Sequence, residues 1–284
     1  MIQNIFDPNN SNFLTAIATV LLVLVGLAQI FVLFSQKKQT RIALTEQYRQ
    51  LWDSLKNIGG NLIFIGRENG EYYQVLDEAS INMLQLETTK HRNNAPTIWA
   101  MESIQKVCGT LGEISTRVLQ GHLKIGDIYP IFGTQFLRQS RPLRILLEAE
   151  KQNPNQFDGT TQQHLRIRTE MQDWLIYHDG LRRRCLILID LLWAQAAKLE
   201  DLPPNDLQSA AEAKKNTGKL NRNRVFNETI RLQGIINIHL AIKLAMYLRK
   251  AEYRSWSNWS GISKKRLANL NNDWSNRLLR KGAK

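Results

Sequence analysis

The segment that most constrains this chain is residues 13–34, FLTAIATVLLVLVGLAQIFVLF, a run of 22 residues without a charge. At about 1.5 Å of rise per residue, a helix of this length extends roughly 33 Å, enough to cross a hydrocarbon core of about 30 Å. A helix also satisfies its own backbone hydrogen bonds, as a lipid environment requires. We therefore predict a transmembrane helix over residues 13–34.

The charges that flank this segment predict its orientation. Residues 1–12 contain no Lys or Arg, whereas Lys37, Lys38 and Arg41 follow the apolar run directly. Loops rich in Lys and Arg stay in the cytoplasm. The expected location is thus the cell inner membrane, crossed once, with residues 1–12 outside and the C-terminal part in the cytoplasm. The apolar run is longer than that of a signal peptide, and no small-x-small cleavage site follows it.

Beyond the anchor, apolar residues recur at steps of three and four, which is typical of helices, and no strand alternation is present. We predict an all-α fold: one N-terminal transmembrane helix that continues to Gly59-Gly60 and leads into a cytoplasmic multi-helix bundle. Cys108 and Cys185 lie inside apolar helical patterns and are expected to be reduced core residues. The further helices are expected near residues 96–121, 127–153 with a kink at Ser140, 158–200, 225–249 and 264–279, with a flexible linker from Lys214.

The net charge divides the chain. Residues 214–284 contain 17 Lys and Arg and three acids, a net charge of +14, while residues 1–213 have a net charge of −1. We therefore divide the cytoplasmic part into a helical domain, 35–213, and a basic, Trp-containing helical C-terminal region, 214–284.

This basic region is the strongest indication of function. Anionic lipid attracts Lys and Arg, and Trp favours the membrane interface. Basic and aromatic side chains together also suit nucleic acid. A third interpretation is an amphipathic helix that buries its Trp and Leu and leaves its cations in solvent. The residues expected to contact lipid, nucleic acid or another polyanion are Lys250, Arg254, Trp256, Trp259, Lys264, Lys265, Arg266 and Trp274.

The common catalytic signatures are absent: there is no phosphate-binding GxxxxGK[ST] loop, no GxSxG and no HExxH. Arg117 and His122 form an R-x4-H pattern that resembles the catalytic motif of HEPN ribonucleases. In that family His acts as the general base and Arg stabilises phosphate charge, without metal. His178-Asp179 matches the dipeptide of HD phosphohydrolases, but a hydrogen-bonded core histidine is the preferred interpretation of His178. No cofactor and no metal site are expected.

Gln29 is the one strongly hydrogen-bonding side chain deep in the predicted span. A polar group in hydrocarbon is often paired across two helices, which would make the anchor self-associate. The alternative is that Gln29, about one turn from the cytoplasmic boundary, reaches water.

Two segments carry a family resemblance. TRIALTEQYRQLW (40–52) and GDIYPIFGTQFLR (126–138), after the anchor, resemble a family of uncharacterised bacterial single-pass membrane proteins with a cytoplasmic helical domain of unknown function. The resemblance covers about residues 10–150. It implies the architecture described above and no catalytic residues.

The sequence thus predicts a membrane-anchored helical interaction or sensor module whose partner protein is not identifiable. The alternative hypothesis is a membrane-tethered ribonuclease of the HEPN type, acting as a defence effector.

Overall fold

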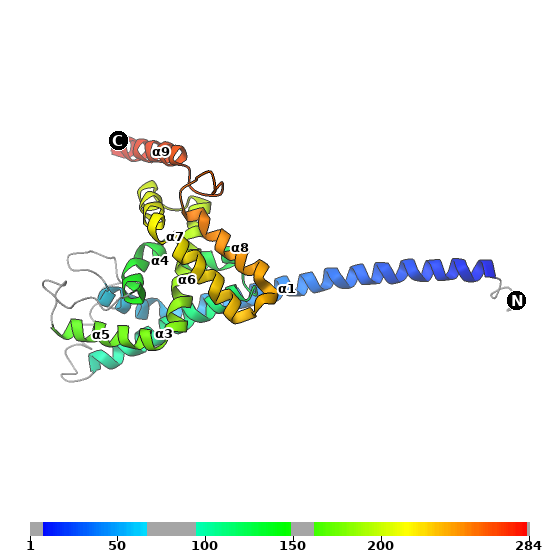
Figure 1. The fold of residues 1–284 in the computed structure, drawn as a ribbon, viewed down its shortest axis with the longest axis horizontal. Coiled ribbons are helices and arrows are strands. Elements are labelled where there is room, and N and C mark those ends of the chain that lie inside the picture. The colour runs from blue at the N-terminus through cyan, green and yellow to red at the C-terminus, as the bar shows by residue number, and fades with distance from the viewer. Residues whose placement is uncertain (1–7, 67–94, 149–161, 283–284) are drawn as a thin grey trace. The chain divides into compact units, whose positions relative to one another are not determined.

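A computed structural model describes residues 8–66, 95–148 and 162–282 of the chain (Figure 1). The chain forms two compact units, residues 1–47 and 48–284. The described residues are helical apart from turns and one loop, and among them only two isolated bridges occur, Tyr253 with Ile262 and Ser255 with Asn258. The all-α prediction is therefore confirmed.

The first unit consists of the N-terminal part of helix α1, Pro8–Gly66. Its large apolar side chains between Ile17 and Phe34 are exposed. Within the described ranges α1 is the one helix long and apolar enough to cross a membrane, a property that a signal sequence near the N-terminus would share. The predicted break at Gly59-Gly60 is wrong, since α1 continues to Gly66. Glycine weakens a helix by about 1 kcal/mol but keeps its N–H donor, so the ladder of hydrogen bonds continues.

The second unit begins with the last part of α1, where Tyr48, Trp52 and Leu55 lie on one buried face. The Trp52 ring meets the Phe132 ring of α4, Ile125–Glu148, edge-on at a centroid distance of 4.8 Å. The Tyr48 hydroxyl donates a 2.8 Å hydrogen bond to Glu113 of α3, Ala95–Leu119. These aromatic contacts join α1 to the helices that follow it.

Helix α6, Asp179–Leu199, is the centre of the second unit. The eight consecutive residues Cys185–Leu192 are all buried, so this helix is covered on every side. The Cys185 thiol donates to the Cys108 carbonyl at 3.3 Å, and both cysteines are free and buried, as predicted. The helices in contact with α6 are α3, α4, α5 (Gln162–Tyr177), α7 (Pro204–Gln233), α8 (Ile238–Leu248) and the 3₁₀ turn η4 (Arg249–Ala251).

Two helices expected to be continuous are each divided. The predicted helix 158–200 breaks at His178, which has φ −100° and ψ 46°. The half-buried His178 ring stacks on Trp174, and its Nδ1 lies 2.9 Å from the Trp174 carbonyl oxygen. The predicted helix 225–249 breaks at Gly234, whose φ of 71° favours glycine, and η3 (Ile235–Asn237) follows.

Two other local expectations are also wrong. Helix α4 departs from helical geometry at Gly133 (φ 64°, ψ −174°), rather than at Ser140 before Pro142. Lys214 does not begin a flexible linker, because α7 runs without interruption through residues 214–224. Side chains of this segment pair with acids elsewhere in the second unit, and these contacts hold a polar sequence in a helix.

The most buried of these acids is Asp190 of α6, which is 1% exposed. Arg144 of α4 donates to its Oδ1 at 2.8 Å, and Lys214 of α7 bonds the same oxygen. Burial alone would raise the pKa of the Asp190 carboxyl, but Lys214 and Arg144 outweigh burial and lower this pKa to about 2. One buried carboxylate thus joins α4, α6 and α7.

Replacement of Asp190 by Asn should lower the free energy of unfolding by about 3–5 kcal/mol at pH 7, because the buried cations lose the charge that neutralises them. Urea denaturation followed by circular dichroism measures this change. The matched control is Glu102→Gln, which removes an exposed ion pair with Lys106 and should cost less than about 1 kcal/mol.

The pH dependence of the free energy of unfolding gives a second measure of the interaction between Asp190 and its cations. The folded-state pKa of Asp190 is about 2, below the ordinary value of 3.8, so the Asp190 carboxylate stabilises the fold above about pH 4. This stabilisation is lost as the pH falls from about 4 to 2. The native chain should therefore lose more stability over this window than the Asp190→Asn variant, and equal losses would contradict the assignment.

Candidate functional site

Several cations of residues 214–284 are paired with acids inside the fold. On α7, Lys214 and Arg224 face Asp190, Arg222 bonds Glu252, and Arg231 lies 3.5 Å from the buried Glu228. Each of these four cations thus has an acidic partner within the fold. The cations available to an external partner are concentrated after α8.

A loop of residues 252–263, here called the Trp loop, joins η4 to helix α9, Lys264–Gly282. Its ends are tied by hydrogen bonds from Arg254 N to Ile262 O at 2.9 Å and from Ile262 N to Glu252 O at 2.8 Å. Its tip is closed by reciprocal bonds between Ser255 and Asn258 at 3.0 and 3.1 Å. The loop is therefore a folded element with its own backbone pairing.

Two residues hold this loop in shape. Asn258 is 5% exposed, and its Nδ2 donates to the carbonyls of Arg249 at 2.9 Å and Tyr253 at 3.3 Å. At Gly261, a Cβ would lie 2.5 Å from the carbonyl oxygen of Glu252 and 2.6 Å from Asn258 Nδ2. Only glycine allows the two sides of the loop to approach this closely.

The Trp loop turns its two tryptophans outward. Trp256 is 93% exposed and Trp259 is 71% exposed. The guanidinium of Arg254 lies over the Trp259 ring, 5.7 Å from its centroid. Both rings are accessible to solvent, and an exposed apolar patch is a candidate interaction surface.

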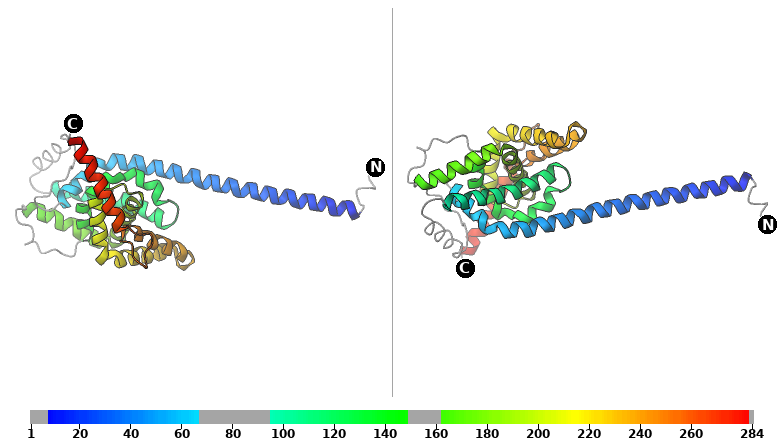
Figure 2. Two further views of the ribbon diagram at one scale, coloured as in Figure 1. Left: turned by 90° about the horizontal axis from the view of Figure 1, so that it is seen from above. Right: turned by 90° about the horizontal axis from the view of Figure 1, so that it is seen from below.

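Helix α9 follows the Trp loop and packs on α7 (Figure 2). Leu267 is buried and Leu270 half-buried, as an amphipathic helix against the domain requires. Lys265 is exposed, and Lys264 lies over the Tyr253 ring at 5.3 Å. Trp274, further along α9, is 45% exposed.

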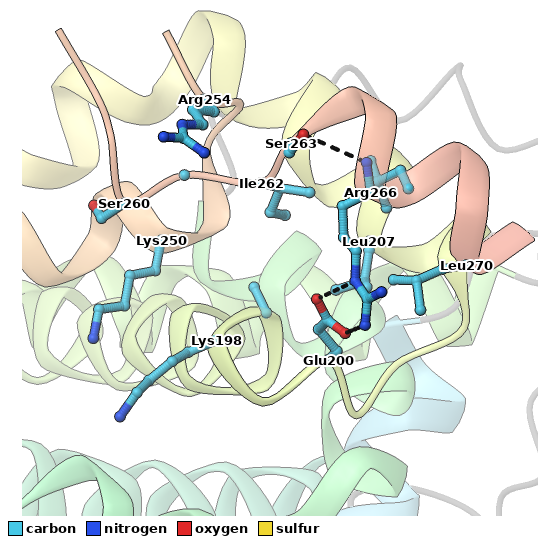
Figure 3. Close-up of a pocket in the computed structure, with 13 residues that line it drawn as sticks. Lys198, Glu200, Leu207, Lys250, Arg254, Ser260, Ile262, Ser263, Arg266 and Leu270 are labelled. Atoms are coloured by element: carbon cyan, nitrogen blue, oxygen red, sulfur yellow. Dashed lines mark hydrogen bonds and ion pairs between the residues drawn. The ribbon is translucent and has the colours of Figure 1, made fainter. Parts of the chain in front are cut away.

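A cavity of about 470 Å³ lies where α6, the Trp loop and α9 meet (Figure 3). Four cations and one carboxylate contribute to its wall. Figure 3 shows Lys198 and Lys250 together on one side and Leu207 and Leu270 on the other. The residues that line the cavity are Ala197, Lys198, Glu200, Leu207, Lys250, Arg254, Ser260, Gly261, Ile262, Ser263, Arg266, Leu267 and Leu270.

The four cations of the cavity differ in their partners. Arg266 forms two hydrogen bonds with Glu200, at 3.1 and 2.9 Å, so this pair is neutral. Lys198, Lys250 and Arg254 form no ion pair with an acid of the described chain. Burial lowers the pKa of Lys250, and the nearby charge of Lys198 lowers it further. The cavity therefore holds an uncompensated positive charge.

The structure brings together only some of the residues predicted to contact lipid, nucleic acid or another polyanion. Lys250, Arg254 and Arg266 line the cavity, and Trp256 and Trp259 lie on the outer surface of the Trp loop. Sequence reasoning missed Lys198, because it stands 52 residues before Lys250 on a different helix and no local pattern links the two. It also missed Glu200, which neutralises Arg266.

The residues of the ribonuclease hypothesis occupy the C-terminal end of α3. Arg117 lies in its last turn, 3.9 Å from Glu113, the acceptor of the Tyr48 hydroxyl. His122 is exposed in the following turn, where its N–H bonds the Arg117 carbonyl at 2.9 Å. Neither residue lines the cavity described above. Arg117 thus supports the packing of α1 on α3, and a catalytic role for this pair stays a prediction.

A further exposed surface lies at the turn between α7 and α8. Ile235 and Ile236 follow Gly234 and are 75% and 94% exposed. Ile242 and Met246 on α8 are also partly exposed. In the first unit, Gln29 is exposed on α1, and its pairing with a second anchor stays a prediction.

No family model matches the chain, and no curated protein or solved structure does so either. The resemblance of residues 10–150 to bacterial single-pass membrane proteins accordingly stays a prediction.

Replacement of Asn258 by Asp should destabilise the folded Trp loop by about 1–3 kcal/mol, because the hydrogen bonds that Asn258 donates to the carbonyls of Arg249 and Tyr253 are lost. Hydrogen exchange measured by mass spectrometry should then show faster exchange within residues 252–263 and unchanged exchange in α6. Ser255→Ala, which alters an exposed hydroxyl of the same loop, is the control. Equal protection in the native chain and Asn258→Asp would show that Asn258 does not hold the loop.

Proposed function

We propose that this chain is a single-pass membrane-anchored helical interaction or sensor module, whose Trp loop and adjacent cations contact the anionic surface of the inner leaflet. In this proposal the apolar part of α1 is an uncleaved anchor, the N-terminus lies outside, and residues 48–284 are cytoplasmic. The protein acts by binding rather than by catalysis.

The observation that carries the proposal is the pair of exposed tryptophans on a folded loop. Trp256 and Trp259 are held outward by a backbone that Asn258 and Gly261 determine. Tryptophan has an apolar ring and one N–H donor, a combination suited to the interface between water and lipid. A loop already folded also loses little conformational entropy when it binds.

The cations around the Trp loop also suit an anionic lipid surface. Arg254 is exposed and lies over the Trp259 ring, and Lys264 and Lys265 are exposed at the start of α9, directly after the Trp loop. Each cation near an anionic leaflet contributes about 1 kcal/mol. A weak contact of this size is enough to keep the Trp loop on the lipid surface when an anchor already holds the domain close to the bilayer. Tethering raises the effective concentration of lipid that the loop meets. Nucleic acid is the competing polyanion, since the same side chains suit phosphates and stacked bases.

The topology predicts the behaviour of fusions at Lys284. A fluorescent protein fused there should be bright and alkaline phosphatase fused there should be inactive, because Lys37, Lys38 and Arg41 retain the C-terminal side in the cytoplasm. The full-length product should also remain uncleaved on an immunoblot. Active phosphatase with a dark fluorescent fusion would show the inverted topology, and a shortened product would show a cleaved signal peptide.

Docking of the Trp loop can be measured with the full chain in nanodiscs that contain brominated lipid as a quencher. Tryptophan fluorescence should be quenched more in phosphatidylglycerol discs than in phosphatidylcholine discs, and salt should reduce the difference. The predicted span contains no Trp, so quenching reports on the rest of the chain. Replacement of Trp256 and Trp259 by Ser should remove the difference between the two lipids.

The matched control is the pair Ile235→Ser and Ile236→Ser, which removes equally exposed apolar side chains from another surface. This control should retain the lipid-dependent quenching. If the Ile pair abolishes it and the Trp pair does not, the docking surface is the α7–α8 turn and the proposal is wrong. If short RNA added to the discs binds and reverses the quenching, nucleic acid is the preferred polyanion.

A further inference from the structure

We propose that the cavity between α6, the Trp loop and α9 is a binding site for a phosphoryl group carried by a small organic molecule or a lipid. The recognising side chains are Lys198, Lys250 and Arg254. This inference goes beyond membrane docking, because a free phosphate ester can enter the cavity without a bilayer.

The geometry of the cavity supplies the first argument. Its volume of about 470 Å³ is that of a small-molecule site, and three separate segments of the chain form its wall. Lys198 comes from α6, Lys250 from η4 and Arg254 from the Trp loop. Figure 3 shows Lys198 and Lys250 extending in the same direction from neighbouring elements. Cations from separate parts of the chain thus line one cavity.

The charge balance indicates the class of ligand. The Glu200–Arg266 pair is neutral, which leaves Lys198, Lys250 and Arg254 as the cations of the cavity wall without an acidic partner in the described chain. Lys250 also lies over the Tyr247 ring at 4.0 Å, and Arg254 lies over the Trp259 ring at 5.7 Å. The lowered pKa of Lys250 reflects burial and the repulsion from Lys198, and a bound anion would relieve that repulsion. A phosphate monoester carries about −1.5 to −2 charges at pH 7 and three acceptor oxygens, so it compensates three cations better than a carboxylate does.

Two further features suit a phosphorylated organic molecule. Ser260 and Ser263 add hydroxyl groups to the wall, and Ser263 directly precedes the N-terminus of α9, the helix end that favours anions. The Ser263 hydroxyl also accepts a hydrogen bond from the Arg266 backbone N–H at 3.4 Å. Leu207, Ile262 and Leu270 form an apolar part of the same wall. A ligand with a phosphoryl group at one end and an apolar or neutral part at the other would match both parts.

Calorimetric titration of the full chain in neutral detergent tests the site, with inorganic phosphate and glycerol 3-phosphate as soluble probes. A parallel titration uses mixed micelles that contain phosphatidic acid. The variant Lys198→Gln with Lys250→Gln should weaken binding at least tenfold. The control Lys219→Gln with Lys243→Gln removes the same charge from exposed positions outside the cavity and should bind as the native chain does.

The titrations distinguish a free phosphate ester, a lipid headgroup and the absence of a phosphate site. Binding of the soluble probes that requires Lys198 and Lys250 supports a free phosphate ester, and binding of phosphatidic acid alone with the same requirement supports a lipid headgroup. Absence of binding to all three probes, or equal losses in the two double variants, overturns the site. The variant Trp256→Ser with Trp259→Ser, whose two positions do not line the cavity, separates the two proposals: it should abolish docking and leave phosphate binding unchanged.

Discussion

The second unit depends on the neutralisation of two carboxylates that are buried where charge is costly. Asp190 and Glu228 are each less than 5% exposed, and cations from neighbouring helices reach both of them. An ion pair of this kind is strongly destabilising when one partner is lost. The positions of α4, α6 and α7 are therefore coupled through charge as well as through apolar packing. This coupling also explains why the polar start of the basic region is a regular helix.

The sequence predicted the fold class well because apolar periodicity reports directly on which face of a helix is buried. It also predicted the buried cysteines, since both lie within strong apolar stripes. Helix ends were less predictable. His178 and Gly234 interrupt helices through local backbone angles and a side-chain contact, whereas Gly59-Gly60 leaves the helix intact.

The candidate site was only partly visible in the sequence for a different physical reason. Exposed Trp and Lys residues close together along the chain, such as Trp256, Trp259 and Lys264, could be grouped without a structure. The cavity could not, because Lys198 and Leu207 reach it through the packing of α6 and α7. Equally, the net charge of residues 214–284 overstated what is available at the surface, because acids earlier in the chain neutralise part of it. Asp190 pairs with Lys214, Glu200 with Arg266 and Glu212 with Lys215.

The Trp loop carries two exposed tryptophans on its outer surface and forms part of the cavity wall with the same backbone. Some of its positions determine how the backbone folds, and others determine only what the loop contacts. A Phe or Tyr in place of Trp256 or Trp259 would leave the hydrogen bonds of the loop intact. Any side chain at position 261 would meet the Glu252 carbonyl at 2.5 Å. The fold of the loop therefore constrains Gly261 and Asn258 but not Trp256 and Trp259, so a substitution at either Trp changes what the loop contacts without changing how its backbone is held.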